Sequence, residues 1–177
     1  MNIAITGRMG SGKTTIAEIL RNQYDYSIVR ISERLKQIVR DLELPYRRDV
    51  LQETGDFFRK FDGIVWVRQA IRKADDLLAK GASGIAIDDV RYKNEQIALK
   101  NAQFKIIRVS AAERKRKMWI SLRDSIEISD DEWQRWSVHP TELEIDSIPV
   151  DYEMSNDGTK DELMIKVKNL IEILPSL

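Results

Sequence analysis

An eight-residue segment near the start of the chain has the composition and spacing of a phosphate-binding loop. Residues 7–14 read GRMGSGKT and fit the pattern G-x-x-x-x-G-K-[ST], between a short apolar run and a helical one. The glycines allow the backbone to wrap around a polyphosphate, and the loop amides then face its negative charge. Lys13 can reach the β- and γ-phosphates, and the Thr14 hydroxyl can hold Mg²⁺. Because pattern and context agree, nucleoside triphosphate binding is favoured over a glycine-rich turn without a ligand.

A second group of reactive side chains follows the apolar run at residues 84–87. Asp88 and Asp89 could support Mg²⁺ or activate a hydroxyl, and Arg91 suits a second phosphate group. Together they favour phosphoryl transfer between two bound anions. A GTPase would carry a guanine-reading N-K-x-D segment, which the sequence lacks, and a motor ATPase is usually longer.

Further arginines lie where a small-molecule kinase needs positive charge. Arg34 follows the second strand candidate, and Arg59 precedes Trp66. Arg114 and Arg116 stand at the start of a helix after the strand that ends near residue 109. A closing lid uses such arginines because charge spreads over the transferring phosphoryl group. The plainer interpretation of a single arginine is a solvated surface residue. The place of Arg114 and Arg116 in the strand order favours the lid.

Composition excludes several other functions. The 177 residues suit one domain, and 29 basic against 29 acidic side chains argue against a broad nucleic-acid-binding surface. We therefore expect no nucleic acid partner. The absence of cysteine and the single histidine exclude disulfides, thiol nucleophiles and multi-histidine zinc sites. No apolar run approaches the ~20 residues of a membrane span, and no secretory signal is recognisable. A cytoplasmic protein without a membrane partner is expected.

Short β-like runs alternate with longer helical runs. Strands are expected at residues 2–6, 27–31, 84–88 and 104–109, and helices at residues 13–22, 32–40, 49–60, 66–78 and 92–101. Ser32 is expected to cap a helix, and Ser110 and Thr159 each open a capping-box pattern. The alternation predicts a parallel sheet covered on both faces, with ligands outside the carboxyl ends of its strands.

Four stretches resemble the phage-type deoxynucleoside monophosphate kinases. Residues 89–95 read DVRYKNE and resemble the family's D-V-R-[FY]-x-N-E segment. Residues 51–67 carry an L-Q-x-x-G-x-x-x-R…W-V pattern, and residues 139–144 an H-P-[ST]-E element. Residues 151–159 resemble the last strand and its N-x-G-T turn. The resemblance covers nearly the whole chain. Adenylate kinases and dephospho-coenzyme A kinases are more distant relatives with the same core.

The resemblance implies a fold and a domain organisation. The expected fold is the P-loop NTPase α/β fold, with three α/β/α layers, a parallel five-stranded sheet and a small helical lid. Residues 1–177 would form one kinase domain, with the lid at about residues 112–146. Trp133 and Trp136, three residues apart, are expected to bury this lid rather than to stack on a base.

Together with the pattern of arginines, the resemblance implies roles for individual residues. Mg²⁺ would be held by Thr14 and Asp89. The donor ATP would be bound by Gly7, Arg8, Gly10, Ser11, Gly12, Lys13, Thr14, Thr15, Asn156 and Gly158. The acceptor would be bound by Arg34, Arg59, Trp66 and Arg91. The catalytic residues would be Lys13, Asp89, Arg91, Arg114 and Arg116.

Two residues depart from the family pattern and leave the acceptor open. Lys93 replaces a proline that is common in the family, and Arg8 adds a charge to the loop, facing either phosphate or solvent. The favoured function is ATP- and Mg²⁺-dependent phosphoryl transfer to a (deoxy)nucleoside 5′-monophosphate. Dephospho-coenzyme A or another phosphorylated metabolite is an alternative acceptor. A nucleotide-binding switch that transfers nothing is the alternative from another class.

The expected partner is a small-molecule nucleotide, and a homodimer is one of the oligomeric states left open. His139 is expected to have a structural or acceptor-side role, because phosphoryl transfer depends mostly on positioning and charge stabilisation.

Overall fold

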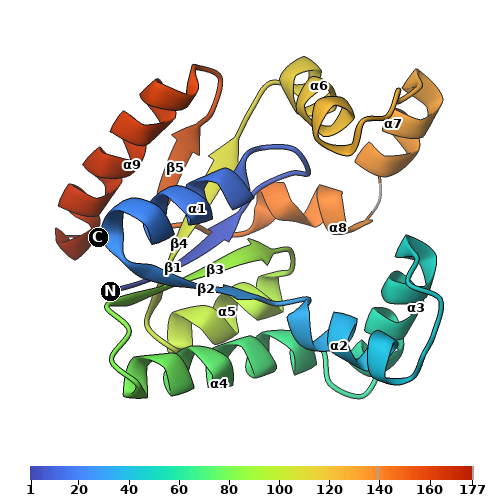
Figure 1. Ribbon diagram of the computed structural model, residues 1–177, viewed down its shortest axis with the longest axis horizontal. Coiled ribbons are helices and arrows are strands. Elements are labelled where there is room, and N and C mark those ends of the chain that lie inside the picture. The colour runs from blue at the N-terminus through green and yellow to red at the C-terminus, as the bar shows by residue number, and fades with distance from the viewer. Residues whose placement is uncertain (139, 177) are drawn as a thin grey trace.

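A parallel five-stranded sheet forms the centre of the protein (Figure 1). The computed structural model describes residues 1–138 and 140–176. All neighbouring strands pair in parallel, in the order β2-β3-β1-β4-β5. The strands are β1 (Asn2–Thr6), β2 (Tyr26–Arg30), β3 (Gly84–Val90), β4 (Phe104–Ser110) and β5 (Tyr152–Ser155). The predicted strand number and the parallel sheet are confirmed.

Helices cover both faces of this sheet. The α-helices are α1 (Lys13–Tyr24), α2 (Glu33–Asp41), α3 (Arg48–Arg59), α4 (Val65–Ala79), α5 (Lys93–Asn101), α6 (Glu113–Asp124), α7 (Asp130–Ser137), α8 (Pro140–Leu143) and α9 (Lys160–Ile173). Two short 3₁₀ segments, η1 (Glu144–Ser147) and η2 (Leu174–Ser176), complete the elements. Helices α1 and α9 lie together on one face, and α4 and α5 lie on the other (Figure 1). The three-layer arrangement is therefore as predicted.

Side chains alternate between two apolar cores along the central strand. In β1, Ile3 and Ile5 are fully buried against α1 and α9, whereas Ala4 is buried on the opposite face. This burial on both faces explains why the strands read as continuous apolar runs. Each fully buried isoleucine contributes about 2–3 kcal/mol of transfer free energy, which fixes the sheet on which the site is built.

The helix starts show where local patterns succeed. Thr159 and Glu162 form the predicted capping box of α9. The Ser110 capping box is wrong, because Ser110 is still part of β4 and α6 begins after Ala112. The backbone N–H of Ala112 donates instead to the Asp157 carboxylate at 2.7 Å, which satisfies an amide at this end of α6. A side chain 45 residues away thus replaces the local cap.

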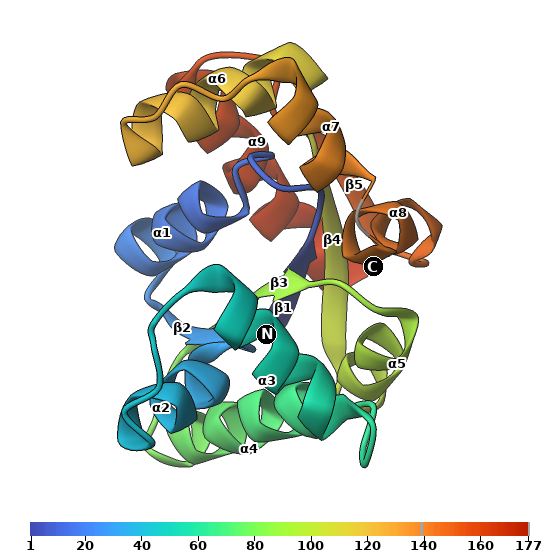
Figure 2. The ribbon, with the colours of Figure 1, turned by 90° about the vertical axis from the view of Figure 1, so that its right-hand side faces the viewer.

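Helices α6 and α7 stand together beyond the carboxyl ends of the strands, opposite α2 and α3 (Figure 2). They share a small apolar cluster of Ile120, Ile128 and Trp133, against which Met9 and Trp136 pack. The predicted burial of Trp133 is confirmed, at 3% exposure. No helix in the part of the chain that the structure describes is long and apolar enough to cross a membrane.

Candidate active site

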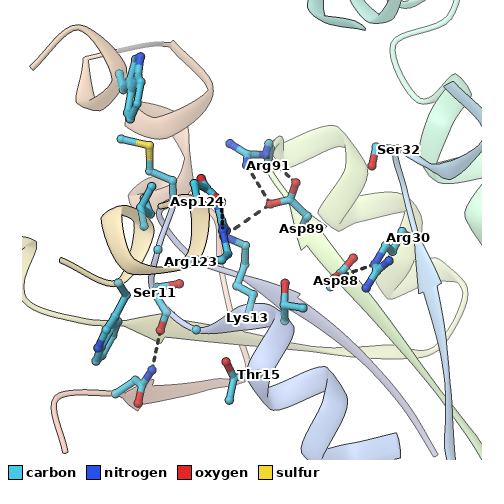
Figure 3. A pocket seen from close by; sticks show the side chains of 18 of the residues that line it. Ser11, Lys13, Thr15, Arg30, Ser32, Asp88, Asp89, Arg91, Arg123 and Asp124 are labelled. Atoms are coloured by element: carbon cyan, nitrogen blue, oxygen red, sulfur yellow. Dashed lines mark hydrogen bonds and ion pairs between the residues drawn. The ribbon is translucent and has the colours of Figure 1, made fainter. Parts of the chain in front are cut away.

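A bulge at the carboxyl end of β3 brings two carboxylates to one place. Ala4 of β1 pairs with Ile87, but Thr6 pairs with Val90, so β3 carries one extra residue. Asp89 accommodates it with a φ of 70°, in the left-handed region. Such a conformation costs a non-glycine residue about 1–3 kcal/mol and is concentrated at functional sites. Bulges redirect side chains, and Figure 3 shows Asp89 turned toward Lys13 and Arg91, whereas the neighbouring Asp88 is turned toward Arg30.

The phosphate loop, residues 7–14, needs its glycines because other backbone and side chains press against it. Gly12 has a φ of 100°, and a Cβ there would overlap the Asn156 amide. That amide donates to the Ser11 carbonyl at 2.9 Å and so ties the loop to the segment after β5. Gly10 has a φ of 75°, and its Cβ would lie 2.8 Å from the Arg116 carbonyl. The loop is thus held from two sides in the shape that cradles phosphates.

Lys13 lies folded back over its own loop. Its Nζ donates to the carbonyls of Gly7 at 2.6 Å and Arg8 at 3.2 Å. The same Nζ is 3.5 Å from the Asp89 carboxylate, and the residue is only 8% exposed. Burial lowers the pKa of Lys13, although the negative charge of Asp89 opposes this. The nearby carboxylate therefore helps to keep the ammonium charged for a phosphate ligand.

Asp89 and Arg91 form a two-pronged ion pair beside Lys13 (Figure 3). The Arg91 Nε donates to one Asp89 oxygen at 3.1 Å, and its Nη2 lies 3.0 Å from the other. Burial alone would raise the pKa of Asp89, but the charges of Arg91 and Lys13 hold it well below the usual range. The carboxylate is thus ionised throughout the physiological pH range.

Asp88 lies in a different electrostatic environment from its neighbour. It is 5% exposed, and its carboxylate is 3.6 Å from the Arg30 Nε at the end of β2. Burial and the adjacent Asp89 charge raise the pKa of Asp88 to about 6, against the opposing charges of Arg30 and Lys13. The nearby cations thus do not offset the burial of Asp88, as is expected of a carboxylate that meets a further cation on ligand binding.

One cavity of about 1150 Å³ joins these groups. The phosphate loop and residues 156–159 line the predicted donor side, and residues of α2, α3 and the end of β3 line the predicted acceptor side. The predicted residues that line it are Gly10, Ser11, Gly12, Lys13, Thr14, Thr15, Arg59, Asp89, Arg91, Asn156 and Gly158. The structure therefore brings together most of the predicted donor site and part of the predicted acceptor site.

The remaining predicted residues do not line this cavity: Gly7, Arg8, Arg34, Trp66, Arg114 and Arg116. Gly7 contributes its carbonyl to Lys13. The Arg8 guanidinium is engaged by Asp146, with its shortest contact at 2.6 Å. Arg34 and Arg114 are exposed to solvent on their helices. Their predicted ligand contacts stay predictions.

Two of these side chains are structural supports in this arrangement. Trp66, 2% exposed, donates its indole N–H to the Gly55 carbonyl at 3.1 Å and so fixes α3, which carries Arg59. Arg116, 4% exposed, lies behind the phosphate loop and donates to the Met9 carbonyl at 3.2 Å. Neither side chain lines the cavity in this structure, and the predicted acceptor role of Trp66 and catalytic role of Arg116 stay predictions.

The structure adds residues that the sequence interpretation missed. Arg30 and Lys36, and not Arg34, line the cavity on the predicted acceptor side, and Ser32 lines it without making the predicted cap hydrogen bond. On α6, the cavity is lined by Arg123 rather than Arg114. Arg123 lies two turns after Arg116, near the end of α6, whereas the sequence interpretation considered only the arginines at the start of this helix.

The site has the donor atoms that a magnesium nucleotide requires. The Thr14 hydroxyl and the carboxylates of Asp88 and Asp89 line the same cavity, and such oxygens are the ligands that Mg²⁺ prefers. The described residues include no cluster of three or more metal-ligating side chains, so bound phosphate and water would supply the other ligands. The buried Ser11 hydroxyl has no hydrogen-bond partner among the described residues. A phosphate in the loop fits both observations. His139 lies outside the described residues.

Comparison with known proteins supplies a family. Residues 3–135 match the family model AAA_18, described as an AAA domain. An uncharacterized protein, ORF77 of Ictalurid herpesvirus 1 (strain Auburn), is 31% identical over 105 residues, which cover 55% of this chain. The match spans 45% of that viral protein, so the chain covers less than half of its length.

Solved structures support the fold. TT1252 from Thermus thermophilus superposes with a TM-score of 0.64 at 18% identity, over 98% of this chain and 97% of that one. A sugar kinase from Janibacter sp. HTCC2649 superposes with a TM-score of 0.63 at 14% identity, over 99% and 96% of the two chains. With the parallel sheet and the phosphate loop after β1, these matches confirm the predicted P-loop NTPase α/β fold.

Proposed function

The chain belongs to the AAA domain family AAA_18, and we propose that it is an ATP-dependent phosphotransferase that acts on a small-molecule acceptor. The observation that carries the proposal is the alignment of Lys13, Asp89 and Arg91 in one cavity. Lys13 belongs to the phosphate loop, and Arg91 follows β3 and pairs with Asp89, whose carboxylate is 3.5 Å from the Lys13 Nζ. Two cations held by one carboxylate suit two anionic substrates that meet between them.

The acceptor that this site suits best is a (deoxy)nucleoside 5′-monophosphate. Its side of the cavity carries the basic residues Arg30, Lys36, Arg59 and Arg91. The Arg59 guanidinium lies 4.8 Å from the centre of the Tyr92 ring, so positive charge and aromatic surface occur together. A phosphate joined to a planar base presents both kinds of surface to such a site.

In the proposed reaction, transfer depends on charge neutralisation and on the positioning of the two substrates. Bound Mg²⁺ would neutralise charge on the β- and γ-phosphate oxygens. Lys13 would exchange its carbonyl partners for phosphate oxygens, and Arg91 would hold the acceptor phosphate. An acceptor oxygen then forms a bond to the γ-phosphorus while the bond between that phosphorus and the β–γ bridging oxygen breaks, which releases ADP. Arg123 of α6 could approach the transferring group from the lid.

A second class of acceptor is an alcohol, as in dephospho-coenzyme A or a sugar. The observation in its favour is Asp88, a carboxyl in the cavity whose pKa is raised to about 6 and which could accept a hydroxyl proton. The Janibacter relative in fold is described as a sugar kinase. A phosphate acceptor needs no such base, because its oxygen is already ionised.

The test is ADP release from Mg·ATP in the presence of single acceptors. The panel contains ribo- and deoxynucleoside monophosphates, dephospho-coenzyme A and simple sugars, with Lys13→Met as the control. We expect acceptor-dependent turnover with a nucleoside monophosphate and its loss in the control. Turnover with an alcohol alone would establish the second class. Tight nucleotide binding with no acceptor-dependent turnover would contradict both and favour a switch.

A further inference from the structure

A buried carboxylate outside the predicted site touches both of its halves. Glu142 of α8 is 3% exposed. One of its oxygens accepts the backbone N–H of Met9 at 2.8 Å, and the other accepts the Arg91 Nη1 at 2.7 Å. Met9 belongs to the donor phosphate loop, whereas Arg91 is the proposed acceptor group. A single side chain thus bridges backbone and guanidinium across the site.

The Met9 peptide is held on both sides. Its N–H is bound by Glu142, which follows the lid helices, and its carbonyl accepts from Arg116, which precedes most of the lid. The Met9 side chain packs on the apolar cluster of the lid around Trp133. The neighbouring Arg8 is held by Asp146, at the end of the predicted lid segment, residues 112–146. The first half of the phosphate loop is therefore bound to residues near both ends of the predicted lid segment.

The ion pairs continue from Glu142 and return to the loop. Arg91 pairs with Glu142 and Asp89, and Asp89 lies 3.5 Å from the Lys13 ammonium. Lys13 donates to the carbonyl of Gly7. The charges alternate in sign along this path. It begins at Met9 and ends at Gly7, both in the phosphate loop. A change in the charge of one member must alter the balance at the others, because neighbouring members are in direct contact and the two end members, Glu142 and Lys13, are buried.

We propose that Glu142 is a positioning residue that couples the acceptor guanidinium of Arg91 to the phosphate loop through the N–H of Met9. The inference rests on the proposed function in one respect, the assignment of Arg91 to binding of the acceptor. An anion that binds Arg91 weakens the ion pair between Arg91 and Glu142. This changes the hydrogen bond from the Met9 N–H to Glu142, and with it the position of the phosphate loop. Since such a coupling is reciprocal, donor and acceptor change each other's affinity.

The coupling can be measured with Mg·ADP alone, by isothermal titration calorimetry, without an acceptor. Arg91→Met leaves Glu142 as a buried, unpaired negative charge beside the phosphate loop, so Mg·ADP binding should weaken by about tenfold. Adding Glu142→Gln removes that charge and should restore most of the lost affinity. If Glu142 merely supported the fold, its substitution would not restore Mg·ADP binding. It would weaken the protein further.

Glu144→Gln is the matched control. Glu144 lies two residues further along the same segment and accepts the backbone N–H of Lys93 at 2.9 Å, a bond of the same kind. In the Arg91→Met background it should restore nothing. If Arg91→Met fails to fold by circular dichroism, Arg91→Lys keeps the cation but cannot bridge two carboxylates, and the same rescue applies.

Rescue by Glu142→Gln and not by Glu144→Gln supports the coupling. If Arg91→Met and Glu142→Gln each weaken Mg·ADP binding and their effects multiply in the double variant, the inference is overturned. It is also overturned if neither single substitution changes the Mg·ADP affinity. These results are independent of the acceptor panel, so a failed nucleoside monophosphate assignment leaves the inference standing. Absence of Mg·ADP binding to the wild-type protein would overturn the inference and the proposed function together.

Discussion

Replacement of Asp88 by asparagine should stabilise the free protein at neutral pH. Asp88 is buried, and its pKa is raised from 3.8 to about 6 by burial and by the charge of Asp89. A shift of this size corresponds to about 3 kcal/mol between the two protonation states. The partner Arg30 has a side chain that is 51% exposed, so loss of this pair leaves a cation that water can solvate.

The sign of the pH dependence follows from linkage. A carboxyl whose pKa is raised on folding stabilises the protein fully below its unfolded pKa, and this contribution is lost as pH rises through the folded pKa. For Asp88 the loss falls between 3.8 and about 6. Asp88→Asn and wild type should therefore be similarly stable near pH 4, and the variant more stable by up to about 3 kcal/mol near pH 8.

Urea-induced unfolding at several pH values measures this difference directly. Subtraction of the two curves cancels the other titrating groups. Asp75→Asn, at an exposed position on α4, is the control and should show no gain that grows with pH. A constant difference between Asp88→Asn and wild type from pH 4 to pH 8 would refute the reasoning, because it would mean that Asp88 titrates alike in the folded and unfolded states.

Three further changes test the geometry of the site. Gly12→Ala should reduce the ATP affinity and lower the free energy of unfolding in urea by about 2–4 kcal/mol, because it strains the left-handed backbone at residue 12 and displaces Asn156. An equal cost in an Asn156→Ala background would disprove the clash. Arg123→Gln should lower kcat by about tenfold or more, whereas Arg114→Gln should leave kcat within about twofold of wild type. The reverse order would favour Arg114, as the sequence predicts, over Arg123. Trp66→Phe should raise the acceptor KM through a displaced α3 and leave the Mg·ATP affinity unchanged by calorimetry; an unchanged KM would refute this indirect role.

Donor-side features were predictable because they are local. The phosphate loop is eight consecutive residues with a strand before it and a helix after it, and its pattern states the backbone shape that the glycines permit. The alternation of strands and helices likewise predicts the layered sheet.

The acceptor side was harder because it depends on contacts between distant residues. The bulge at Asp89 is set by the register of β1 against β3, which no segment of β3 contains by itself. Glu142 reaches Met9 across 133 residues, and the pairing of Arg8 with Asp146 spans 138. The choice of Arg123 over Arg114 depends on which face α6 turns to the cavity. An arginine-rich helix start does not reveal this.

Transfer of labelled γ-phosphoryl from Mg·ATP to a nucleoside monophosphate tests the central claim most directly. The products of wild type and Lys13→Met are separated and the label is followed. The site predicts label in the nucleoside diphosphate, none of it in the Lys13→Met reaction, and little as free phosphate. Label that appears only as free phosphate, or that remains in ATP with every acceptor, would contradict a phosphotransferase built on Lys13, Asp89 and Arg91.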